Sequence, residues 1–477
     1  MQLRGTVLIG ERKKENGLRL NNWRDYLGAN FFVFGGSCFL WLEYVRTKYN
    51  LIIFVLDEGG NHEIVKEFTG MINKIEIKNF KSIVDLKMDL GRINVIIGAN
   101  GCGKTNLLES FAFASAASQK KLDNEYLLAR GIRIPGPQFV IPAFEDLEES
   151  DGKSVKISVH ENLTVRDIEA KFNKESKKWE EVSVSDKDRN MLKLIDGVIG
   201  KELSDKDEIE FKQIIDKGIE SLSMKVMAEA IRRILSDLSK KNPDKSDAIK
   251  EYMDSLLEEN QSLPTFLIFS PDEIILREQN IESPIKPLGI HGEGLFSFLK
   301  EQMKNEKDLF GKLNEGLSLL DWFDGLDVPK DLLSNEAKLL IGDRYLKESL
   351  HFFDQRSTNE GFLYLLFYLT LFNSKETPSF FAIDNIEASF NPKLCMHLIK
   401  HLIELAKEND KQVILTTHSP FVLDALDLRD DEQRLFVARR DIDGHTRLTR
   451  IKYKAERTQK LSEVWMNGYI GGLPDNF

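Results

Sequence analysis

The sequence predicts an α/β fold of the P-loop NTPase class, and three consecutive features support that prediction. Residues 93–97 form a short apolar run typical of a buried strand. The next stretch, residues 98–105, matches the pattern G-x-x-x-x-G-K-[ST] at every fixed position. Apolar residues then recur at helical spacing, at Leu107, Leu108, Phe111 and Ala114. A strand, a glycine-rich loop and a helix start form an anion site, because backbone N–H groups and the helix dipole converge there.

The loop residues have separate expected roles toward a nucleoside triphosphate. Backbone N–H groups would surround the phosphates at Asn100, Gly101, Cys102 and Gly103. Lys104 would reach the β- and γ-phosphates, and the Thr105 hydroxyl would ligate Mg²⁺. The alternative is a chance glycine turn before a helix, and the presence of both Lys and Thr argues against it. The sequence therefore predicts a site for ATP and Mg²⁺.

The composition is that of a folded protein of the reducing cytosol. The chain has 477 residues, of which 42% are hydrophobic and 30% charged, so it can bury a core. The net charge of −11 argues against a nucleic-acid binder with a basic surface throughout, but it permits a local basic strip. Three cysteines, at positions 38, 102 and 395, share no metal-ligand spacing. We therefore expect a cytoplasmic protein without disulfides or a zinc site.

The first 70 residues carry no motif, and we expect an N-terminal extension of unknown role. Residues 27–42 are an uncharged, largely apolar run. This run is shorter than the roughly 20 residues that a spanning helix needs, and Gly35 and Gly36 interrupt it. Two buried strands, the second at residues 51–56, are the expected alternative to a membrane segment.

An alternating strand pattern begins near Met71 and leads into the P-loop strand. We expect a hairpin over residues 72–88 within a first ATPase lobe of residues 71–185. Residues 186–262 become charged and carry an apolar helical stripe, which predicts a compact helical insertion acting as a lid or docking surface. Residues 263–477 then form the second ATPase lobe.

Two later strands supply the polar groups that a P-loop needs. Four apolar residues, 380–383, precede Asp384, which would hold Mg²⁺; a core strand ending in Asp by chance is the alternative. Residues 413–415 form the next apolar strand, which ends close to His418. A His at a strand end can reach a ligand beyond the carboxyl edge of the sheet, although a lone His is usually structural.

These motifs in this order resemble the ABC-type ATPase family, from about Met71 to the C-terminus. The similarity is greatest to its RecF-like and OLD (overcoming lysogenization defect)-like branch, often described as "AAA family ATPase". The resemblance implies an ABC-type ATPase head, with a mixed β-sheet flanked by helices. It also implies that Asp384 is the Walker B Asp, that His418 is the switch-loop His, and that residues 389–392 form the D-loop.

The segment Asn359-Glu360-Gly361 lies where the family's signature motif belongs, but it departs from the usual Ser-Gly-Gly core. In the family this motif closes over the phosphate held by a second protomer, so Asn359 and Gly361 would contact ATP in a head-to-tail dimer. Gly361 permits close backbone approach, and the following helix start favours a phosphate. An ordinary helix N-cap at Asn359 is the alternative.

The residue after Asp384 departs from the family pattern in a way that bears on hydrolysis. The family has a general-base Glu there, and this chain has Asn385. Asn cannot accept a proton from water, although it can orient the water, and Glu387 could substitute as the base. We therefore expect slow hydrolysis and a protein that acts as an ATP-held switch. Asp384, Asn385, Glu387 and His418 form the expected catalytic set.

A basic strip near the C-terminus suggests a partner. Residues 439–460 contain eight Lys or Arg and three acidic residues, in a predicted hairpin that turns at Asp443-Gly444. Such a strip could contact a nucleic-acid backbone, but a charged edge strand is the slightly favoured explanation. Only 59 residues follow His418, which is too few for the Toprim nuclease domain of OLD proteins.

Three functions remain open at this stage. The first is an ATP-gated homodimer that controls a separate effector, such as a nuclease, in phage defence or nucleic-acid maintenance. The second is a sensor or scaffold that binds ATP and barely hydrolyses it. The third is the energy subunit of a transporter, which the altered signature segment argues against.

Overall fold

The computed structural model describes residues 43–46, 50–56, 62–69, 71–133, 139–147, 154–161, 165–173, 178–186, 263–278, 283–305, 307–327, 339–347 and 352–473. The chain divides into two compact units, Met1–Gly70 and Met71–Phe477. In the first unit, β1 (Glu43–Arg46), β2 (Asn50–Leu56) and β3 (His62–Thr69) form an antiparallel sheet. The strand predicted at residues 51–56 is thus confirmed. Residues 27–42, and residues 187–262 of the predicted helical insertion, lie outside the described residues.

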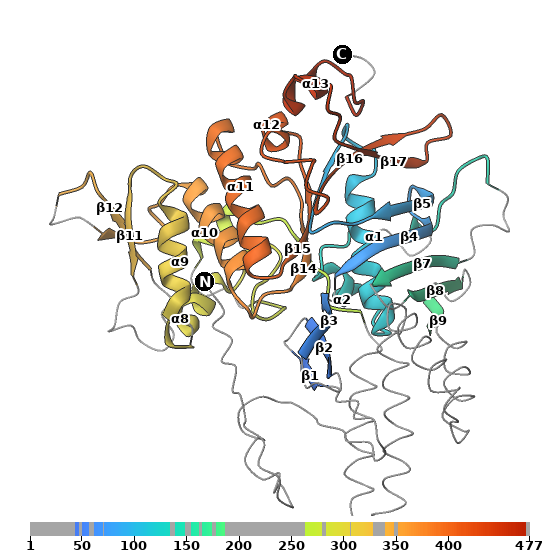
Figure 1. Cartoon of the computed structure of the whole chain (residues 1–477), viewed down its shortest axis with the longest axis horizontal. Coiled ribbons are helices and arrows are strands. Elements are labelled where there is room, and N and C mark those ends of the chain that lie inside the picture. Colours follow the sequence, from blue (N-terminus) through green and yellow to red (C-terminus); the bar gives the residue numbers. More distant parts are fainter. Residues whose placement is uncertain are drawn as a thin grey trace, which may run out of the picture. The chain divides into compact units, whose positions relative to one another are not determined.

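A six-stranded sheet forms the centre of the second unit (Figure 1). Its strands, in spatial order, are β10 (Ile268–Phe269), β14 (Phe380–Ile383), β15 (Gln412–Thr416), β6 (Ile93–Ile97), β16 (Gln433–Arg440) and β17 (Thr446–Ile451). The first five run parallel, and β17 returns antiparallel to β16 as the predicted hairpin. Since parallel strands end at one edge, the residues after β6, β14 and β15 meet there.

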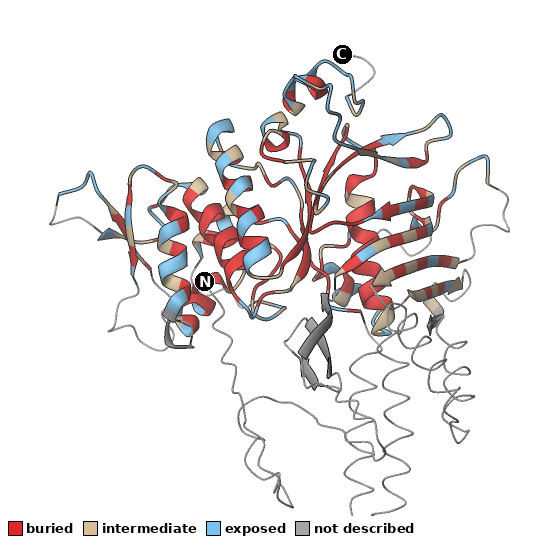
Figure 2. Ribbon diagram, viewed as in Figure 1, coloured by how far each residue is buried: buried red, intermediate tan, exposed pale blue. Residues whose placement is uncertain are grey.

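The two faces of this sheet bury different sets of side chains, as the period of two in a strand requires. Ile93, Val95 and Ile97 of β6 belong to one apolar cluster, and Ile96 belongs to the other. The first cluster contains side chains of α8 (Leu295–Asn305), α9 (Lys307–Leu317), α10 (Glu360–Asn373) and α11 (Pro392–Glu408). Figure 2 shows the buried residues of α10 and of the sheet as one continuous region.

The opposite face is covered by α1 (Lys104–Ser118) and then by a second, antiparallel sheet. That sheet has the order β5 (Ile83–Asp89), β4 (Ile72–Phe80), β7 (Ser154–Glu161), β8 (Val165–Asn173) and β9 (Lys178–Asp186). Because α1 contacts both sheets, it is buried on nearly every side. The hairpin predicted over residues 72–88 is confirmed as β4 and β5.

Shorter elements complete the second unit. Three strands, β11 (Phe323–Asp327), β12 (Leu340–Asp343) and β13 (Phe352–Phe353), form a small antiparallel sheet. The short helices are α2 (Asn124–Leu128), α7 (Glu273–Arg277), α12 (Pro420–Leu423) and α13 (Leu461–Met466). The architecture confirms the predicted fold class, an α/β fold in which the P-loop follows a strand of a mixed sheet flanked by helices.

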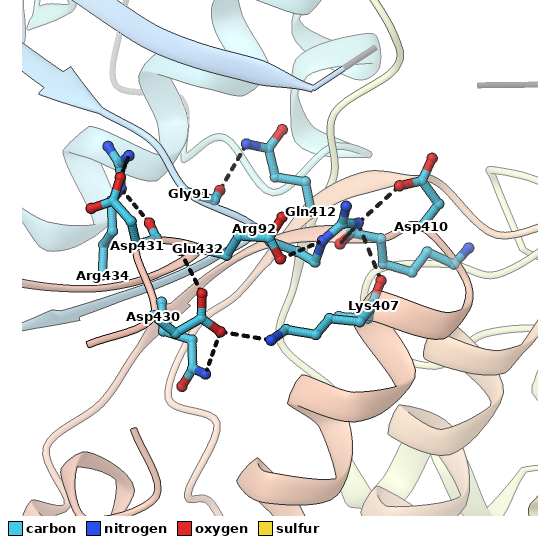
Figure 3. Close-up of polar contacts among 12 residues, drawn as sticks. Gly91, Arg92, Lys407, Asp410, Gln412, Asp430, Asp431, Glu432 and Arg434 are labelled. Carbon is cyan, nitrogen blue, oxygen red and sulfur yellow. Dashed lines mark hydrogen bonds and ion pairs between the residues drawn. The ribbon is translucent and has the colours of Figure 1, made fainter. Parts of the chain in front are cut away.

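A polar network fixes the amino ends of the central strands, at the edge opposite the P-loop (Figure 3). The buried Arg92 guanidinium donates to Asp410 at 2.9 Å and to Glu432 at 3.3 Å. Gln412 donates to the Gly91 carbonyl at 2.9 Å. These bonds join the starts of β6, β15 and β16. They therefore fix the register of the three strands that support the site at their amino ends.

Candidate nucleotide-binding site

The P-loop connects β6 to α1 and has a backbone that requires glycine. Gly98, Gly101 and Gly103 have φ values of 155°, 75° and 102°. A Cβ on Gly98 would lie 2.3 Å from the Ala438 carbonyl oxygen, and one on Gly103 would lie 2.1 Å from Thr446 Oγ1. No atom lies within 4 Å of a Cβ built on Gly101, so the loop is open on that side. The loop therefore presents its backbone to an open space at the start of α1, which fits a phosphate.

The hairpin of β16 and β17 holds the P-loop from outside, and sequence reasoning did not find this contact. Arg440 Nε donates to the Gly101 carbonyl at 3.0 Å. Thr446 Oγ1 donates to the Cys102 carbonyl, also at 3.0 Å. In both bonds the acceptor is a loop carbonyl group, so neither bond occupies a loop N–H group. The loop conformation thus depends on residues more than 300 positions away in the sequence.

Lys104 is buried within the loop. Its Nζ donates to the carbonyls of Gly98 at 2.8 Å and of Ala99 at 3.1 Å. Desolvation lowers the pKa of Lys104, and the nearby Cys102, Asp384 and Glu387 oppose this effect. An anion beside the ammonium would favour its charged form, so the position suits a phosphate.

Three oxygen-bearing side chains meet where β14 and β15 end. Thr105 Oγ1, in the first turn of α1, donates to Asp384 Oδ2 at 3.4 Å. Thr416, the last residue of β15, donates to Asp384 Oδ1. A carboxylate and a hydroxyl are oxygen donors of the kind that Mg²⁺ prefers, so these residues fit that ion. Sequence reasoning placed Thr105 and Asp384 here and missed Thr416, although Thr416 directly follows the strand predicted at residues 413–415.

The two residues expected to act on the attacking water, Asn385 and Glu387, differ in burial and in hydrogen bonding. Asn385 is exposed, has a φ of +56°, and donates its backbone N–H to Thr416 Oγ1 at 2.9 Å. Glu387 is half-buried, and its Oε1 accepts the backbone N–H of His418 at 2.7 Å. Glu387 Oε2 is buried, and it has no hydrogen-bond partner among the described residues. The Glu387 carboxylate is therefore held through one oxygen, while its other oxygen is buried and unpaired among the described residues.

The backbone of His418 meets Glu387 and its side chain is exposed at the same edge of the sheet. Partial desolvation lowers the pKa of His418, and the positive charge of Lys104 lowers it further. The imidazole is therefore neutral near pH 7, and one ring nitrogen can donate a hydrogen bond.

The signature-like segment adjoins the predicted D-loop. Asn359 caps α10, because its Oδ1 accepts the Phe362 N–H at 2.9 Å, as the N-cap alternative predicts. Ser389 donates to the Glu360 carboxylate, and a Cβ on Gly361 would lie 3.3 Å from the Ser389 carbonyl oxygen. The structure thus brings Asn359 to Gly361 together with Ser389, while Thr105, Asp384, Glu387 and His418 gather near Lys104.

A pocket of about 530 Å³ opens beside the P-loop, and sequence reasoning missed it. It is lined by Lys81, Ser82, Asn106, Arg133, Phe139, Phe144 and Arg440. The buried Glu109 on α1 accepts hydrogen bonds from Lys81 and Arg133 and so fixes two of its cations. Cations and aromatic rings next to a phosphate loop suit the ribose and base of a nucleotide.

The basic strip at residues 439–460 has several of its cations engaged within the chain. Arg447 forms an ion pair with Asp441 at 2.7 Å, and Arg450 pairs with Asp431. Arg440 holds the P-loop, as described above. Because β17 is an edge strand of the sheet, the arrangement agrees with the charged-edge alternative. No helix among the described residues has the length and apolar character needed to cross a membrane.

Comparison with known families and with curated proteins gives three matches. A family model described as "AAA domain" matches residues 74–321, just over half of the chain. A model described as "AAA domain, putative AbiEii toxin, Type IV TA system" matches residues 243–424. A curated relative, the uncharacterized protein MJECL10 of Methanocaldococcus jannaschii, is 32% identical over 114 residues, or 21% of this chain and 49% of the relative. The chain therefore spans about half the length of that relative.

Among solved structures, the similar ones include heads of Smc proteins. The SmcHead bound to the C-winged helix domain of ScpA is 12% identical, covers 80% of this chain and 98% of its own, and has a TM-score of 0.48. The Smc head with an extended coiled coil bound to the C-terminal domain of ScpA, from Pyrococcus furiosus, is 14% identical, with coverages of 80% and 96% and a TM-score of 0.43. Neither likeness bears on function.

Proposed function

This chain belongs to the AAA-domain family of P-loop ATPases, and on that basis we propose that it binds Mg-ATP, hydrolyses it slowly and dimerises around it. The observation that carries the proposal is the meeting of Lys104 with two carboxylates, Asp384 and Glu387, from the turn after β14. Lys104 lies in the P-loop, Asp384 follows β14, and Glu387 contacts the backbone after β15. Phosphate binding, metal binding and proton acceptance thus share one edge of the sheet.

ATP is held by the loop and the adjoining pocket. Backbone N–H groups at residues 100–103 and the Lys104 ammonium bind the phosphates. Thr105 and Asp384 hold Mg²⁺, which supplies charge neutralisation on the phosphate oxygens. The aromatic and cationic pocket that includes Phe144 takes the nucleoside. Thr416 supports this set by orienting the Asp384 carboxylate.

Hydrolysis depends on Glu387 in this proposal. The attacking water gives its proton to the Glu387 carboxylate as the oxygen–phosphorus bond to the γ-phosphate forms and the bond to the β–γ bridging oxygen breaks. Asn385 has no acidic group and serves at most to orient the water. Because the base is not in the family's usual position, turnover is slow and the ATP-bound state is long-lived.

The dimer rests on the second half of the site. Asn359 is exposed at the start of α10, and Gly361 adds no side chain there, where the Ser389 carbonyl oxygen would lie 3.3 Å from a Cβ. We infer that Asn359 and Gly361 of one copy contact the γ-phosphate held by the other. The neutral His418 donates a hydrogen bond to the same phosphate, and this bond is lost when the phosphate leaves. Ser389 connects the site to the signature-like segment through its hydrogen bond to Glu360.

We further infer placement in the RecF-like and OLD-like branch, in the cytoplasm, with control of a separate effector in phage defence or nucleic-acid maintenance. The matched family model that names a putative toxin of a type IV system supports the defence setting. The domain organisation proposed is an extension at 1–70, lobes at 71–185 and 263–477, and a helical insertion between them. A sensor with negligible hydrolysis is the second candidate, because Asn385 replaces the usual Glu.

The test is ATP-dependent dimerisation, measured by light scattering after gel filtration, together with nucleotide binding and phosphate release. We expect the native chain to dimerise with Mg-ATP and Lys104→Ala to remain monomeric without bound nucleotide. Lys347→Ala, at an exposed lysine far along the chain, is the matched control and should dimerise normally. A native chain that binds ATP and stays monomeric would overturn the dimer, and one that binds no ATP would overturn the whole proposal.

A further inference from the structure

Two segments meet beside the nucleotide pocket at a cluster of potential metal ligands. Asp443 and His445 lie in the turn between β16 and β17, and Asp146 lies in the described segment 139–147. One ligand atom from each of the three residues lies within 4.8 Å of the other two. His445 Nε2 is 3.1 Å from Asp146 Oδ1. One imidazole and two carboxylates from different parts of the chain thus converge.

The imidazole of His445 is the unusual member of this cluster. The residue is only 4% exposed, and its Nδ1 is buried without a hydrogen-bond partner among the described residues. In either neutral tautomer, one ring nitrogen therefore lacks a partner. The group facing Nδ1 is another carboxylate, Asp441, with Oδ2 at 3.9 Å. A cation bound at Nε2, beside Asp146, would keep the proton on Nδ1, where that proton faces the Asp441 carboxylate.

We propose that Asp146, Asp443 and His445 bind one divalent transition-metal ion, of the Zn²⁺ or Mn²⁺ type. Imidazole nitrogen favours such ions over Mg²⁺ and Ca²⁺, whose sites use oxygen alone. Asp146 and Asp443 are exposed, so the ion can enter from solvent and keep water in its remaining positions. Asp441 stays outside the ligand set, because it accepts from Arg447 at 2.7 Å and from the backbone of Asp443 and His445.

The ion would join segment 139–147 to the hairpin that holds the P-loop. The Phe144 ring packs edge-on against His445, with ring centroids 4.7 Å apart. Arg440 donates to the Gly444 carbonyl at 2.6 Å and to the P-loop carbonyl of Gly101. Both Phe144 and Arg440 line the pocket, so the metal would stabilise the positions of two lining residues. The metal site depends only on Asp146, Asp443 and His445, whereas an effect of the metal on nucleotide binding would rest on the proposed function.

The test is calorimetric titration of the full chain, freed of metal with EDTA, with MnCl₂, ZnCl₂ and MgCl₂ in separate runs without nucleotide. We expect one Mn²⁺ or Zn²⁺ per chain, and at least about a tenfold loss of affinity in the double variant Asp146→Asn, Asp443→Asn. Both substitutions are at exposed residues, so folding is preserved. Glu456→Gln, an exposed acid beyond β17, is the matched control and should bind normally.

Thermal unfolding supplies a second readout. Mn²⁺ or Zn²⁺ should raise the melting temperature of the native chain and leave that of the double variant unchanged. Lys104→Ala should still bind the metal, which separates this inference from the proposed ATPase. Absence of binding, binding undiminished in the double variant, or Mg²⁺ binding as tight as that of Mn²⁺ would each overturn it.

Discussion

Glu387→Gln is the perturbation that separates catalysis from binding most cleanly. Glutamine has the size of glutamate, and its amide oxygen can still accept the His418 N–H that Glu387 Oε1 accepts at 2.7 Å. The side chain therefore keeps its position. The amide nitrogen takes the place of the buried, unpartnered Oε2, so the variant loses the capacity to accept a proton at this position.

The expected size of this effect follows from general-base catalysis. A positioned base contributes about 10²–10⁴ in rate, so turnover should fall by that factor, equivalent to about 3–5.5 kcal/mol in the barrier. The Michaelis constant for ATP should change little, because Lys104, Thr105 and Asp384 are unaltered. The assay is phosphate release at saturating Mg-ATP, supported by single-turnover measurements that exclude product release as the slow step.

Two further variants make the result interpretable. Glu404→Gln removes an exposed carboxylate from α11 and should leave turnover unchanged. Asn385→Ala should lower turnover by less than about tenfold, since Asn385 is expected only to orient water. It should also cost about 1 kcal/mol of stability, because a φ of +56° suits Asn better than Ala. Turnover of Glu387→Gln as fast as that of the native chain would refute the reasoning.

Three other predictions concern stability and reactivity. Arg92→Ala should lower the free energy of unfolding by about 2–3 kcal/mol in urea titrations, less than for a fully buried pair because its carboxylate partners are partly exposed; an unchanged midpoint would contradict it. Burial, with the charge of Glu387, raises the pKa of Cys395 to about 12, so about one thiol in 10⁴ is ionised at pH 8. Cys395 should therefore react with a disulfide reagent only after unfolding, as mass spectrometry of the labelled peptide would show. Hydrogen bonds from Lys74 and Lys87 lower the pKa of Glu76 to about 2. The depressed pKa makes the native state bind fewer protons than the unfolded state. The difference in stability between the native chain and Glu76→Gln, under about 1 kcal/mol, should therefore be constant above pH 4.5 and decline as the pH falls through 2. A difference that is as large at pH 2 as at neutral pH would contradict the assignment.

Local order along the chain made the phosphate side of the site predictable. The strand, loop and helix around residues 93–118 are contiguous. Their pattern alone therefore places Lys104 and Thr105 at the start of the helix that follows the loop. Asp384 and His418 were placed by the rule that parallel strands end at one edge, and the structure has both strands. The hairpin at the C-terminal end was predicted from alternation and its turn residues.

The pocket and the supports of the loop could not be predicted in this way. Phe139 and Phe144 lie in a loop, and Arg440 and Thr446 lie on the edge hairpin, without any spacing that relates them to the P-loop. Glu109 is a buried charge in an apolar helix, and its partners come from two other segments. Contacts of this kind arise from how the two sheets close over α1, which no local pattern encodes.

The sequence by itself determined the chemistry available: a phosphate loop with Lys and Thr, a strand-end Asp, and Asn where a Glu is usual. Only the tertiary structure decided how those groups are placed relative to one another. The parallel register that sets Ile383 opposite Leu415 brings Asp384 beside Thr416, and the turn after β14 exposes Asn385 while partly burying Glu387. Register and turn geometry are fixed by packing across the whole sheet, so the fold determines that Asn385 is exposed and that Glu387 is half-buried.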